Sequence, residues 1–459
     1  MPETRHTIVR LLQNIGSRKE VEQYLKQYSS LDSKQFAIIK AGGAVLRDDL
    51  ENLASSLSFL HRVGLYPIVV HGGGPQLNAA LEAEGVETKR IDGMRVTCPK
   101  TLEVARRVFR EENLKLVDAL ESMGTKARPI TSGVFEAELL DQGKFGLVGE
   151  VTGIQVDAIN SAIRGGCLPI LSSLGETPSG QIVNINADVA ARKMAIRVKP
   201  LKIVFLTGTG GLLDQFDQVI GSVNLVEDFD NLMAQAWLHS GMRLKIQEIK
   251  ELLDDLPLSS SVSITTPAQL ARELFTHRGS GTLVRKGEMI NDFDGVEGVD
   301  QERLRGLLEA CFQRQLDEDY FEKKPFHKIY ISASYRAVAI ITEEDGIPYL
   351  DKFGVTVKAQ GEGLGQSLWA RMKRDFPRLF WRARAENKIN TWYFQEADGT
   401  FQNGPWTVFW YGMQDFEEMK KCVDLALNMP ATFSKHGLAE DLSEDKSENQ
   451  EATVVKENS

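Results

Sequence analysis

Short apolar runs that end in glycine or hydroxyl residues recur along the first part of the chain. "FAIIKAGG" (36–43) and "YPIVVHGGG" (66–74) predict two buried strands, while residues 48–62 and 75–85 predict the helices that follow them. The strand pattern returns at residues 168–173, 202–211 and 261–266. Strands that alternate with helices predict a parallel α/β sheet, and ligands of such sheets bind at the carboxyl ends of the strands.

The rest of the pattern divides the chain into five parts. Residues 1–32 show apolar positions at helical spacing and predict an N-terminal helical arm ahead of a first domain at 33–287. The Asp- and Gly-rich stretch 288–299 predicts a linker. A second domain, 300–435, begins with a helix at 301–316, and it holds five of the six tryptophans. Residues 436–459 are polar and acidic without a period, which predicts a disordered tail.

Composition narrows the class of protein. The 459 residues carry a formal net charge of −10, which argues against a nucleic-acid partner, and no apolar stretch approaches the roughly 20 residues that span a bilayer. The N-terminus lacks the apolar core of a signal peptide. The four cysteines are scattered and form no CxxC pair, so we expect a cytoplasmic protein with reduced thiols and no metal site of its own.

The glycines after the second strand pose a chemical question. An "HGGG" turn can serve as the oxyanion loop of an esterase, but that reading needs a G-x-S-x-G nucleophile elbow, and the chain has none. The other reading is a phosphate cradle of bare backbone N–H groups. Lys40 stands beside Gly42 and Gly43 after the first strand, and Gly73 and Gly74 follow the second. Neighbouring strands would bring both turns to one site for phosphoryl transfer.

Five motifs then occur in a recognisable order. "IKAGG", "VVHGGGPQ", "DGMRVT" (92–97), "NINAD" (184–188) and "GMRLK" (241–245) resemble the amino acid kinase family over some 250 residues. The resemblance implies a three-layer sandwich with a mainly parallel sheet, and it implies ATP with Mg²⁺ as the phosphoryl donor. "FLTGTGGLLD" (205–214) departs from the family, because stand-alone kinases tend to have an Asp-Val pair there.

The same resemblance implies roles for individual residues. Lys40 and Lys245 would flank the transferred phosphoryl group, and Asp188 would orient both lysines. Gly42, Gly43, Gly73 and Gly74 would bind phosphate. Arg95 and Asn184 would hold the carboxylate and amide of an N-acetylated amino acid; a guanidinium can grip a carboxylate with two parallel bonds. A structural alternative for Asp188 is an N-cap on the helix that begins near "VAARKMA".

A second glycine-rich loop lies in the second domain. "QGEGLGQ" (360–366) fits the pyrophosphate loop of GCN5-related acetyltransferases, and "PYLDKFGV", "LFWRARAEN" and "INTWYF" resemble the acetyltransferase domain of vertebrate-type N-acetylglutamate synthases. The resemblance implies an α+β acetyltransferase domain that binds acetyl-CoA. Its implied coenzyme A residues are Gln360, Gly361, Gly363 and Gly365.

The acceptor site follows from the same resemblance. Lys352, Arg382, Arg384 and Asn387 would bind glutamate, and Tyr393 would donate a proton to the departing thiolate. Each has a plainer reading: Arg382 and Arg384 alternate as on a solvated strand face, and Tyr393 lies between aromatic residues as in a core.

The two resemblances together imply that one chain catalyses two consecutive steps of arginine biosynthesis. The second domain would acetylate L-glutamate, and the first would phosphorylate the resulting N-acetyl-L-glutamate. A synthase with a purely regulatory kinase-like domain, and a non-catalytic arginine-sensing protein, remain open. "ARELFTHRGSGTL" (271–283) resembles the arginine-binding stretch of sensitive relatives. The segment makes Glu273 a candidate regulatory residue and arginine an expected inhibitor. We also expect the chain to form a homo-oligomer, a tetramer. On the alternative reading, Glu273 lies on a solvated helix face.

Overall fold

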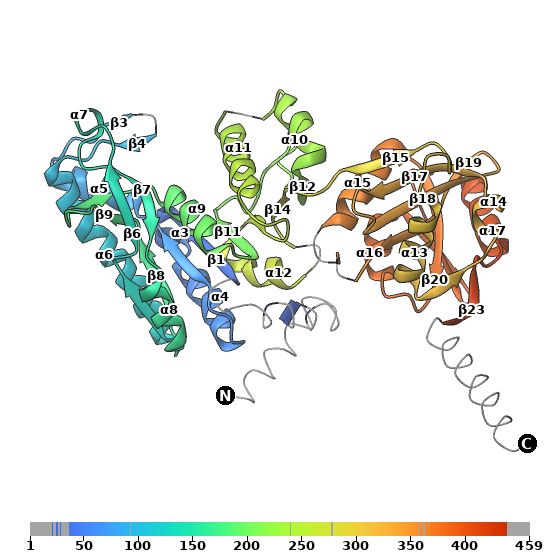
Figure 1. The fold of residues 1–459 in the computed structure, drawn as a ribbon, viewed down its shortest axis with the longest axis horizontal. Coiled ribbons are helices and arrows are strands. Elements are labelled where there is room, and N and C mark those ends of the chain that lie inside the picture. Colours follow the sequence, from blue (N-terminus) through green and yellow to red (C-terminus); the bar gives the residue numbers. More distant parts are fainter. Residues whose placement is uncertain are drawn as a thin grey trace, which may run out of the picture. The chain divides into compact units, whose positions relative to one another are not determined.

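The computed structural model describes residues 21, 24, 25, 28, 36–91, 93–238, 240–276, 279–357, 359–360 and 363–437. The chain forms two compact units, Met1–Gly287 and Glu288–Ser459. Figure 1 traces both units along the sequence. Among the described helices, none combines the length and apolar character that crossing a membrane requires.

The first unit is built on an eight-stranded sheet with the order β12-β14-β13-β11-β1-β2-β8-β5. All pairs in it are parallel except β13 with β14. A smaller sheet has the order β10-β9-β6-β7, and β3 pairs with β4. The strands are β1 (Ala37–Ala41), β2 (Ile68–His71), β3 (Arg90–Ile91), β4 (Met94–Arg95), β5 (Ala127–Ile130), β6 (Phe135–Leu139), β7 (Gly149–Ile154), β8 (Leu168–Ser172), β9 (Leu174–Glu176), β10 (Ile182–Asn184), β11 (Lys202–Leu206), β12 (Ser222–Asn224), β13 (Ser261–Thr265) and β14 (Thr282–Arg285).

Helices cover both faces of the large sheet because successive strand residues point to opposite sides. Ile38 and Val70 pack in one apolar cluster with residues of α9, whereas Ile39 and Val69 pack in another with residues of α4. The predicted three-layer α/β architecture is therefore confirmed. The helices of this unit are α3 (Gly43–Asp48), α4 (Leu50–Arg62), α5 (Gly74–Ala83), α6 (Pro99–Ser122), α7 (Gln142–Phe145), α8 (Asp157–Arg164), α9 (Ala187–Val198), α10 (Leu225–Ala234), α11 (Ser240–Asp254), η2 (Pro267–Gln269) and α12 (Leu270–Phe275).

Four residues of the predicted N-terminal arm are described. All four are helical, and Val21, Tyr24 and Tyr28 are buried in the same apolar cluster as Phe36 and Phe275. The hydroxyl of Tyr28 donates to the carbonyl oxygen of Leu274 at 2.5 Å. These residues therefore pack against α12; the other residues of the arm lie outside the described part of the chain.

The second unit has one seven-stranded sheet with the order β15-β17-β18-β19-β20-β22-β21, in which only β19 and β20 are parallel, and a pair of β16 with β23. The predicted α+β acetyltransferase type is confirmed. The elements are β15 (Ile290–Phe293), α13 (Gln301–Phe312), β16 (Arg314–Leu316), α14 (Tyr320–Lys323), β17 (Phe326–Ser332), β18 (Ala337–Glu344), β19 (Ile347–Val355), α15 (Leu364–Asp375), β20 (Leu379–Arg384), α16 (Asn390–Glu396), β21 (Gly399–Asn403), β22 (Trp406–Tyr411), α17 (Phe416–Asn428) and β23 (Phe433–Gly437).

Two boundaries differ from those that the sequence predicts. Residues 290–293, predicted as part of a linker, form β15 and pair with β17, because apolar Ile290 and Phe293 pack against the second unit. The helix predicted at 301–316 ends at Phe312, since Gln313 adopts a left-handed conformation with φ of 56° and the chain continues as β16. The predicted tail begins within β23, and residues 438–459 lie outside the described residues.

Candidate active sites

The carboxyl ends of β1 and β2 carry two glycine turns that touch. The strands pair in parallel up to their last residues, so the turns at 42–43 and 72–74 begin at the same level of the sheet. A Cβ at Gly43 would stand 2.9 Å from the backbone nitrogen of Gly74 and 2.8 Å from Cδ of Pro75. The backbones approach this closely because Gly43 has no side chain. The predicted meeting of the two turns is confirmed.

Three charged residues lie beside these turns. Lys40 is in β1, and its Nζ lies 2.8 Å from Oδ1 of Asp188 in the first turn of α9. The Lys40 side chain is 16% exposed and that of Asp188 is 49% exposed, so an incoming ligand can still reach the carboxylate. Lys245, on α11, is close enough for the charges of both to act on its pKa. The structure therefore brings together the three charged residues that the sequence predicts.

The pKa of Lys245 shows how this cluster is balanced. Burial lowers the pKa of Lys245, and the positive charge of Lys40 lowers it further, while Asp188 acts in the opposite direction. Burial and like charge both disfavour the protonated ammonium. An anion that binds beside the two lysines would therefore stabilise their positive charges.

The N-cap alternative for Asp188 is wrong. Asn186 caps α9, because its side-chain oxygen accepts a hydrogen bond from the backbone nitrogen of Asp188 at 2.8 Å. Asp188 itself follows inside the helix, where a carboxylate also favours the positive end of the helix dipole. Its side chain is thus available to Lys40.

Arg95 and Asn184 meet through a residue that sequence reasoning missed. The side-chain amide of Asn184 donates to Oγ1 of Thr97 at 3.1 Å, and the same hydroxyl donates to the carbonyl oxygen of Arg95 at 2.9 Å. The Arg95 guanidinium is buried, and its Nη2 donates to Oδ1 of Asn78. Its Nη1 is buried without a hydrogen-bond partner among the described residues. A buried, unsatisfied guanidinium nitrogen is costly, and a ligand carboxylate would satisfy it.

The segment "LTGTGG", which differs from the pattern of the amino acid kinase family, forms an ordered turn after β11. Oγ1 of Thr207 accepts a hydrogen bond from the backbone nitrogen of Gly210 at 3.2 Å, and Oγ1 of Thr282 accepts one from Leu212 at 2.8 Å. The hydroxyls of Thr207 in this segment and Thr282 in β14 thus stabilise the turn through hydrogen bonds to its backbone. These hydrogen bonds form without a bound nucleotide.

The second unit contains a charged cluster that depends on a β-bulge. Adjacent residues of a regular strand point to opposite faces of the sheet. In β19 the register shifts so that Lys352 is opposite Ile340 and Leu350 is opposite Ile341, which makes Asp351 the extra residue. Nζ of Lys352 and Oδ2 of Asp351 can therefore meet at 2.6 Å, with both side chains 5% exposed.

Tyr320, in α14, and Lys324, directly after that helix, join the cluster. Oδ1 of Asp351 lies 3.0 Å from Nζ of Lys324, and its Oδ2 accepts a hydrogen bond from the hydroxyl of Tyr320 at 2.6 Å. Burial alone would raise the pKa of Asp351, but the charges of Lys352 and Lys324 lower it well below its usual value. One carboxylate thus pairs with two ammonium groups, the buried Lys352 and the partly buried Lys324. Lys324 lies in the charged run "EKKPFH", so the sequence offered no signal that it pairs with a buried carboxylate.

The two predicted arginines stack on one tryptophan. The Arg382 guanidinium carbon lies 4.1 Å from the ring centroid of Trp406, and that of Arg384 lies 4.8 Å from it. Arg382 also donates to the carbonyl oxygens of Ala426 and Pro430, at 2.6 and 2.9 Å. The solvated-face reading is therefore wrong for Arg382, because its terminal nitrogens bond to backbone in the last turn of α17 and just after that helix. Its charge still acts on Lys352, whose pKa is lowered by burial first and by Arg382 among smaller causes.

Asn387 lies in the turn before α16. Its side-chain oxygen accepts a hydrogen bond from the backbone nitrogen of Ile389 at 3.3 Å, which stabilises the start of the helix. The neighbouring Asn390 donates to the carbonyl oxygen of Arg384 at 2.8 Å. The structure thus places Asn387 close in the fold to Arg384.

Tyr393 is buried in an aromatic cluster. Its ring centroid lies 5.3 Å from that of Trp381 and 5.5 Å from that of Phe409. Burial raises the pKa of the Tyr393 hydroxyl above its usual value. The core reading of the ring and the donor role of the hydroxyl are compatible, since a raised pKa keeps the proton on the oxygen.

The predicted coenzyme loop leads into α15. Gly363 precedes the helix with φ of 73°, a conformation that favours glycine, and a Cβ at Gly365 would lie 3.1 Å from Val355. Gln360 donates to the carbonyl oxygen of Val355 at 3.3 Å, which closes the turn after β19. The first backbone N–H groups of α15 are the kind of donors that bind a diphosphate. Gly361 lies outside the described residues.

Glu273 is buried in α12, so the solvated-face reading is wrong. Its Oε2 accepts hydrogen bonds from the backbone nitrogens of Ser280 and Gly281, at 2.8 and 3.1 Å. A Cβ at Gly279 would stand 2.5 Å from the same oxygen. The carboxylate therefore fixes the chain that leads into β14.

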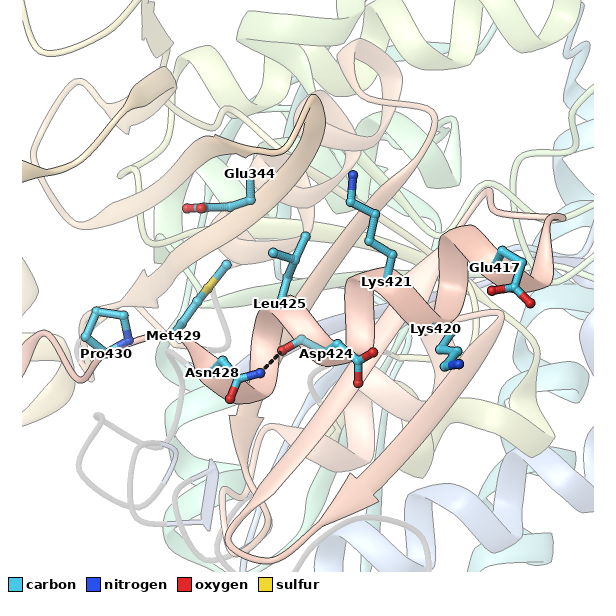
Figure 2. Close-up of a pocket in the computed structure, with 9 residues that line it drawn as sticks. All are labelled: Glu344, Glu417, Lys420, Lys421, Asp424, Leu425, Asn428, Met429 and Pro430. Carbon is cyan, nitrogen blue, oxygen red and sulfur yellow. Dashed lines mark hydrogen bonds between the residues drawn. The ribbon is translucent and has the colours of Figure 1, made fainter.

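A surface hollow of ≈ 580 Å³ lies along α17. It is lined by Glu344, Lys420, Lys421 and Asp424 among others (Figure 2). Its rim includes both signs of charge, and none of the predicted site residues lines it. It carries no assignment.

Two family models match the chain. The first, described as the amino acid kinase family, matches residues 35–258, and the second, described as the N-acetyltransferase of N-acetylglutamate synthase, matches residues 288–428. The chain is 52% identical to an acetylglutamate kinase of Xanthomonas campestris over 89% of this chain and 97% of that protein. It is 33% identical to human mitochondrial N-acetylglutamate synthase over 92% of this chain and 77% of that protein. A solved N-acetylglutamate synthase from Neisseria gonorrhoeae shares the fold, with a TM-score of 0.58 and 19% identity, over 86% of this chain and 98% of that one.

Replacing Gly43 by alanine should destabilise the first unit. The new Cβ would be 2.9 Å from the nitrogen of Gly74, so one turn must shift, and overpacking of this kind costs roughly 1–3 kcal/mol. Gly221→Ala is the matched control, since a Cβ there meets nothing within 4 Å. The measurement is urea unfolding followed by circular dichroism. Equal unfolding midpoints for the two variants would contradict the close approach of the turns.

Lys245 should titrate below the usual pKa of about 10.4 for a lysine. Asp188→Asn should lower the pKa of Lys245 further, because the variant removes the charge that favours the ammonium. Competitive labelling with acetic anhydride at a series of pH values measures both quantities. The exposed Lys250 on the same helix serves as the internal comparison. A pKa of Lys245 that rises in Asp188→Asn would refute the proposed charge balance.

Proposed function

The chain belongs to the family of acetylglutamate kinases and N-acetylglutamate synthases that join an amino acid kinase domain to an N-acetyltransferase domain, and we propose which residues perform each reaction. The protein is a bifunctional enzyme of arginine biosynthesis. Its second domain transfers the acetyl group of acetyl-CoA to L-glutamate, and its first phosphorylates the side-chain carboxylate of N-acetyl-L-glutamate with ATP. The non-catalytic alternative is thereby set aside.

The observation that carries the kinase assignment is the Lys40–Asp188 pair beside the two touching glycine turns. We propose that Lys40 and Lys245 neutralise charge on the transferred phosphoryl group while Asp188 holds them in place. The backbone N–H groups of Gly43 and Gly73 bind phosphate oxygens, and Gly42 and Gly74 leave room for them.

Arg95 and Asn184 hold N-acetyl-L-glutamate, the acceptor of the kinase reaction. Arg95, with its unsatisfied buried Nη1, binds the α-carboxylate of N-acetyl-L-glutamate, and Asn184 binds its amide. ATP supplies the phosphoryl group and arrives with Mg²⁺, which needs few protein ligands when phosphate oxygens and water fill its coordination shell. A purely regulatory first domain would not need the paired lysines beside an open carboxylate.

We propose that acetyl transfer uses the charged cluster and the aromatic cluster of the second unit. Lys352, Arg382, Arg384 and Asn387 attract and orient the two carboxylates of glutamate. The neutral amine attacks the thioester carbonyl, the C–S bond breaks, and the departing thiolate takes the proton of the Tyr393 hydroxyl. The proton that the attacking nitrogen loses goes to solvent, and solvent returns a proton to the Tyr393 oxygen. Coenzyme A binds through its diphosphate at the turn of Gln360, Gly361, Gly363 and Gly365 and the first turn of α15.

Three further statements are part of the proposal. The enzyme assembles as a homo-oligomer, a tetramer, in the cytoplasm, and arginine inhibits it by binding near Glu273. The domain limits 1–32, 33–287, 300–435 and 436–459 likewise stay predictions, apart from the corrected linker. Glu273 can contribute to arginine binding only through what its backbone contacts leave free, so its effect on arginine would be partly indirect.

The two activities should separate by substitution. Lys40→Ala should lower ADP release roughly a hundredfold with N-acetyl-L-glutamate as substrate, because one transition-state donor is worth about 3 kcal/mol, and it should leave release of free coenzyme A unchanged. Tyr393→Phe should do the reverse, by about two to four orders of magnitude. Lys250→Ala, an exposed lysine, is the control. Wild-type ADP release by Lys40→Ala would refute the kinase site.

Arginine should lower one or both activities of the intact enzyme. Deleting residues 1–30 or changing Glu273→Ala should weaken this response without abolishing catalysis, because a ligand shifts activity only if it favours one arrangement of the protein over another. Arginine titrations of both assays measure the effect. Identical inhibition curves in the intact, truncated and substituted enzymes would rule out this regulatory site.

A further inference from the structure

The carbonyl groups of both glycine turns are tied to consecutive residues of one helix. On the first turn, the side-chain amide of Gln76 donates to the carbonyl oxygen of Gly43 at 2.8 Å and to Oε2 of Glu112 at 2.9 Å. On the second turn, Nδ1 of His71 lies 3.1 Å from the carbonyl oxygen of Gly72. Asn113, which follows Glu112 on α6, contacts the other ring nitrogen of His71.

The hydrogen bonds fix which nitrogen of His71 carries the proton. The carbonyl oxygen of Gly72 can only accept, so Nδ1 must be the donor. Nε2 then accepts from the amide of Asn113 at 3.0 Å, and the hydroxyl of Ser172 lies 3.2 Å from it. The same Asn113 nitrogen donates to the carbonyl oxygen of Ile170 at 3.0 Å, which sets the orientation of the amide.

Burial keeps the His71 imidazole in one protonation state. His71 is fully buried, and burial lowers its pKa to about 4, although the bond to Gly72 and the charge of Glu112 act to raise it. The imidazole is therefore neutral at neutral pH, with its single proton at Nδ1. Ser173 adds a further restraint, because its hydroxyl donates to the carbonyl oxygen of His71 at 3.0 Å.

Peptide geometry connects these tethers to the site. The C=O and N–H of a trans peptide point in opposite directions within one plane. Holding the carbonyl of Gly72 toward His71 therefore directs the N–H of Gly73 to the other side, and holding the carbonyl of Gly43 does the same for the next N–H along α3. We propose that His71, supported by Asn113, is a positioning residue that aims the phosphate-binding N–H of Gly73, while Gln76, supported by Glu112, holds the first turn in place beside the second.

This inference rests on the proposed phosphate role of the turns. It predicts that the donor at the Nδ1 position is what matters at residue 71, and that the size of the side chain is secondary. Asparagine can place its amide nitrogen near the position of Nδ1, whereas the longer glutamine places its amide near Nε2 and leaves the carbonyl of Gly72 without a donor.

The test compares His71→Asn with His71→Gln in the full-length enzyme. We expect His71→Asn to keep kcat of the kinase reaction within about threefold of wild type, and His71→Gln to lower it roughly tenfold or more, because misaimed donors forfeit transition-state stabilisation. The KM for N-acetyl-L-glutamate should stay unchanged in both, since its proposed ligands are elsewhere. Release of free coenzyme A, measured in the same preparations, reports that the chain is folded.

The outcomes separate the inference from the function it rests on. Equal kinase activity of the two variants, whether high or low, would overturn the positioning role, because a role in packing alone would not distinguish the two amides in this direction. Asn113→Leu provides a second test, since it leaves Nδ1 in place but removes the support of Nε2, and it should also lower kcat and not raise KM. A wild-type enzyme that releases no ADP would instead refute the kinase assignment itself.

Discussion

The parallel pairing of β1 with β2 is the constraint on which the first active site depends. Because the two strands end at the same level, both glycine turns and Lys40 reach one point at the carboxyl edge of the sheet. The missing side chain of Gly43 permits contact with the second turn. Asp188 reaches this point from the start of α9, whose cap is set by Asn186. The site is thus assembled by strand register and helix starts, with no long flexible loop among the described residues that form it.

The second unit solves a similar electrostatic problem with a different local structure. In both units one carboxylate stands beside more than one cation, Asp188 with two lysines and Asp351 with Lys324 and Lys352. The remaining positive charge suits anionic substrates, phosphate in the first unit and a dicarboxylate in the second. In the second unit the β-bulge of β19 makes the arrangement possible, since it lets neighbouring residues share a face.

Local pattern predicted the strands of the first domain and the glycine turns well, because each is specified by adjacent residues. β1 and β2 lie where the apolar runs predict them, and α15 follows the second glycine loop. The predicted linker failed because an Asp- and Gly-rich stretch still placed two apolar residues where β17 offered an edge to pair with.

Contacts between distant residues explain what the sequence could not provide. The tether of His71 to Asn113 joins residues of β2 and α6, and the pair of Lys324 with Asp351 joins a charged run to a buried strand. Arg382 looked solvated because alternation cannot reveal the carbonyl groups at the end of α17 that accept its hydrogen bonds. The named roles of the site residues came from the resemblance to families, and geometry adds support through burial, charge and unsatisfied donors.

The central claim is that one chain performs both reactions in order, and the wild-type enzyme tests it directly. The measurement is ADP release with L-glutamate as the only amino acid, MgATP present, and acetyl-CoA added or withheld. The account predicts that ADP forms only after acetyl-CoA is added, and that N-acetyl-L-glutamate accumulates when ATP is withheld. Release of coenzyme A without any ADP, even when N-acetyl-L-glutamate is supplied, would contradict it.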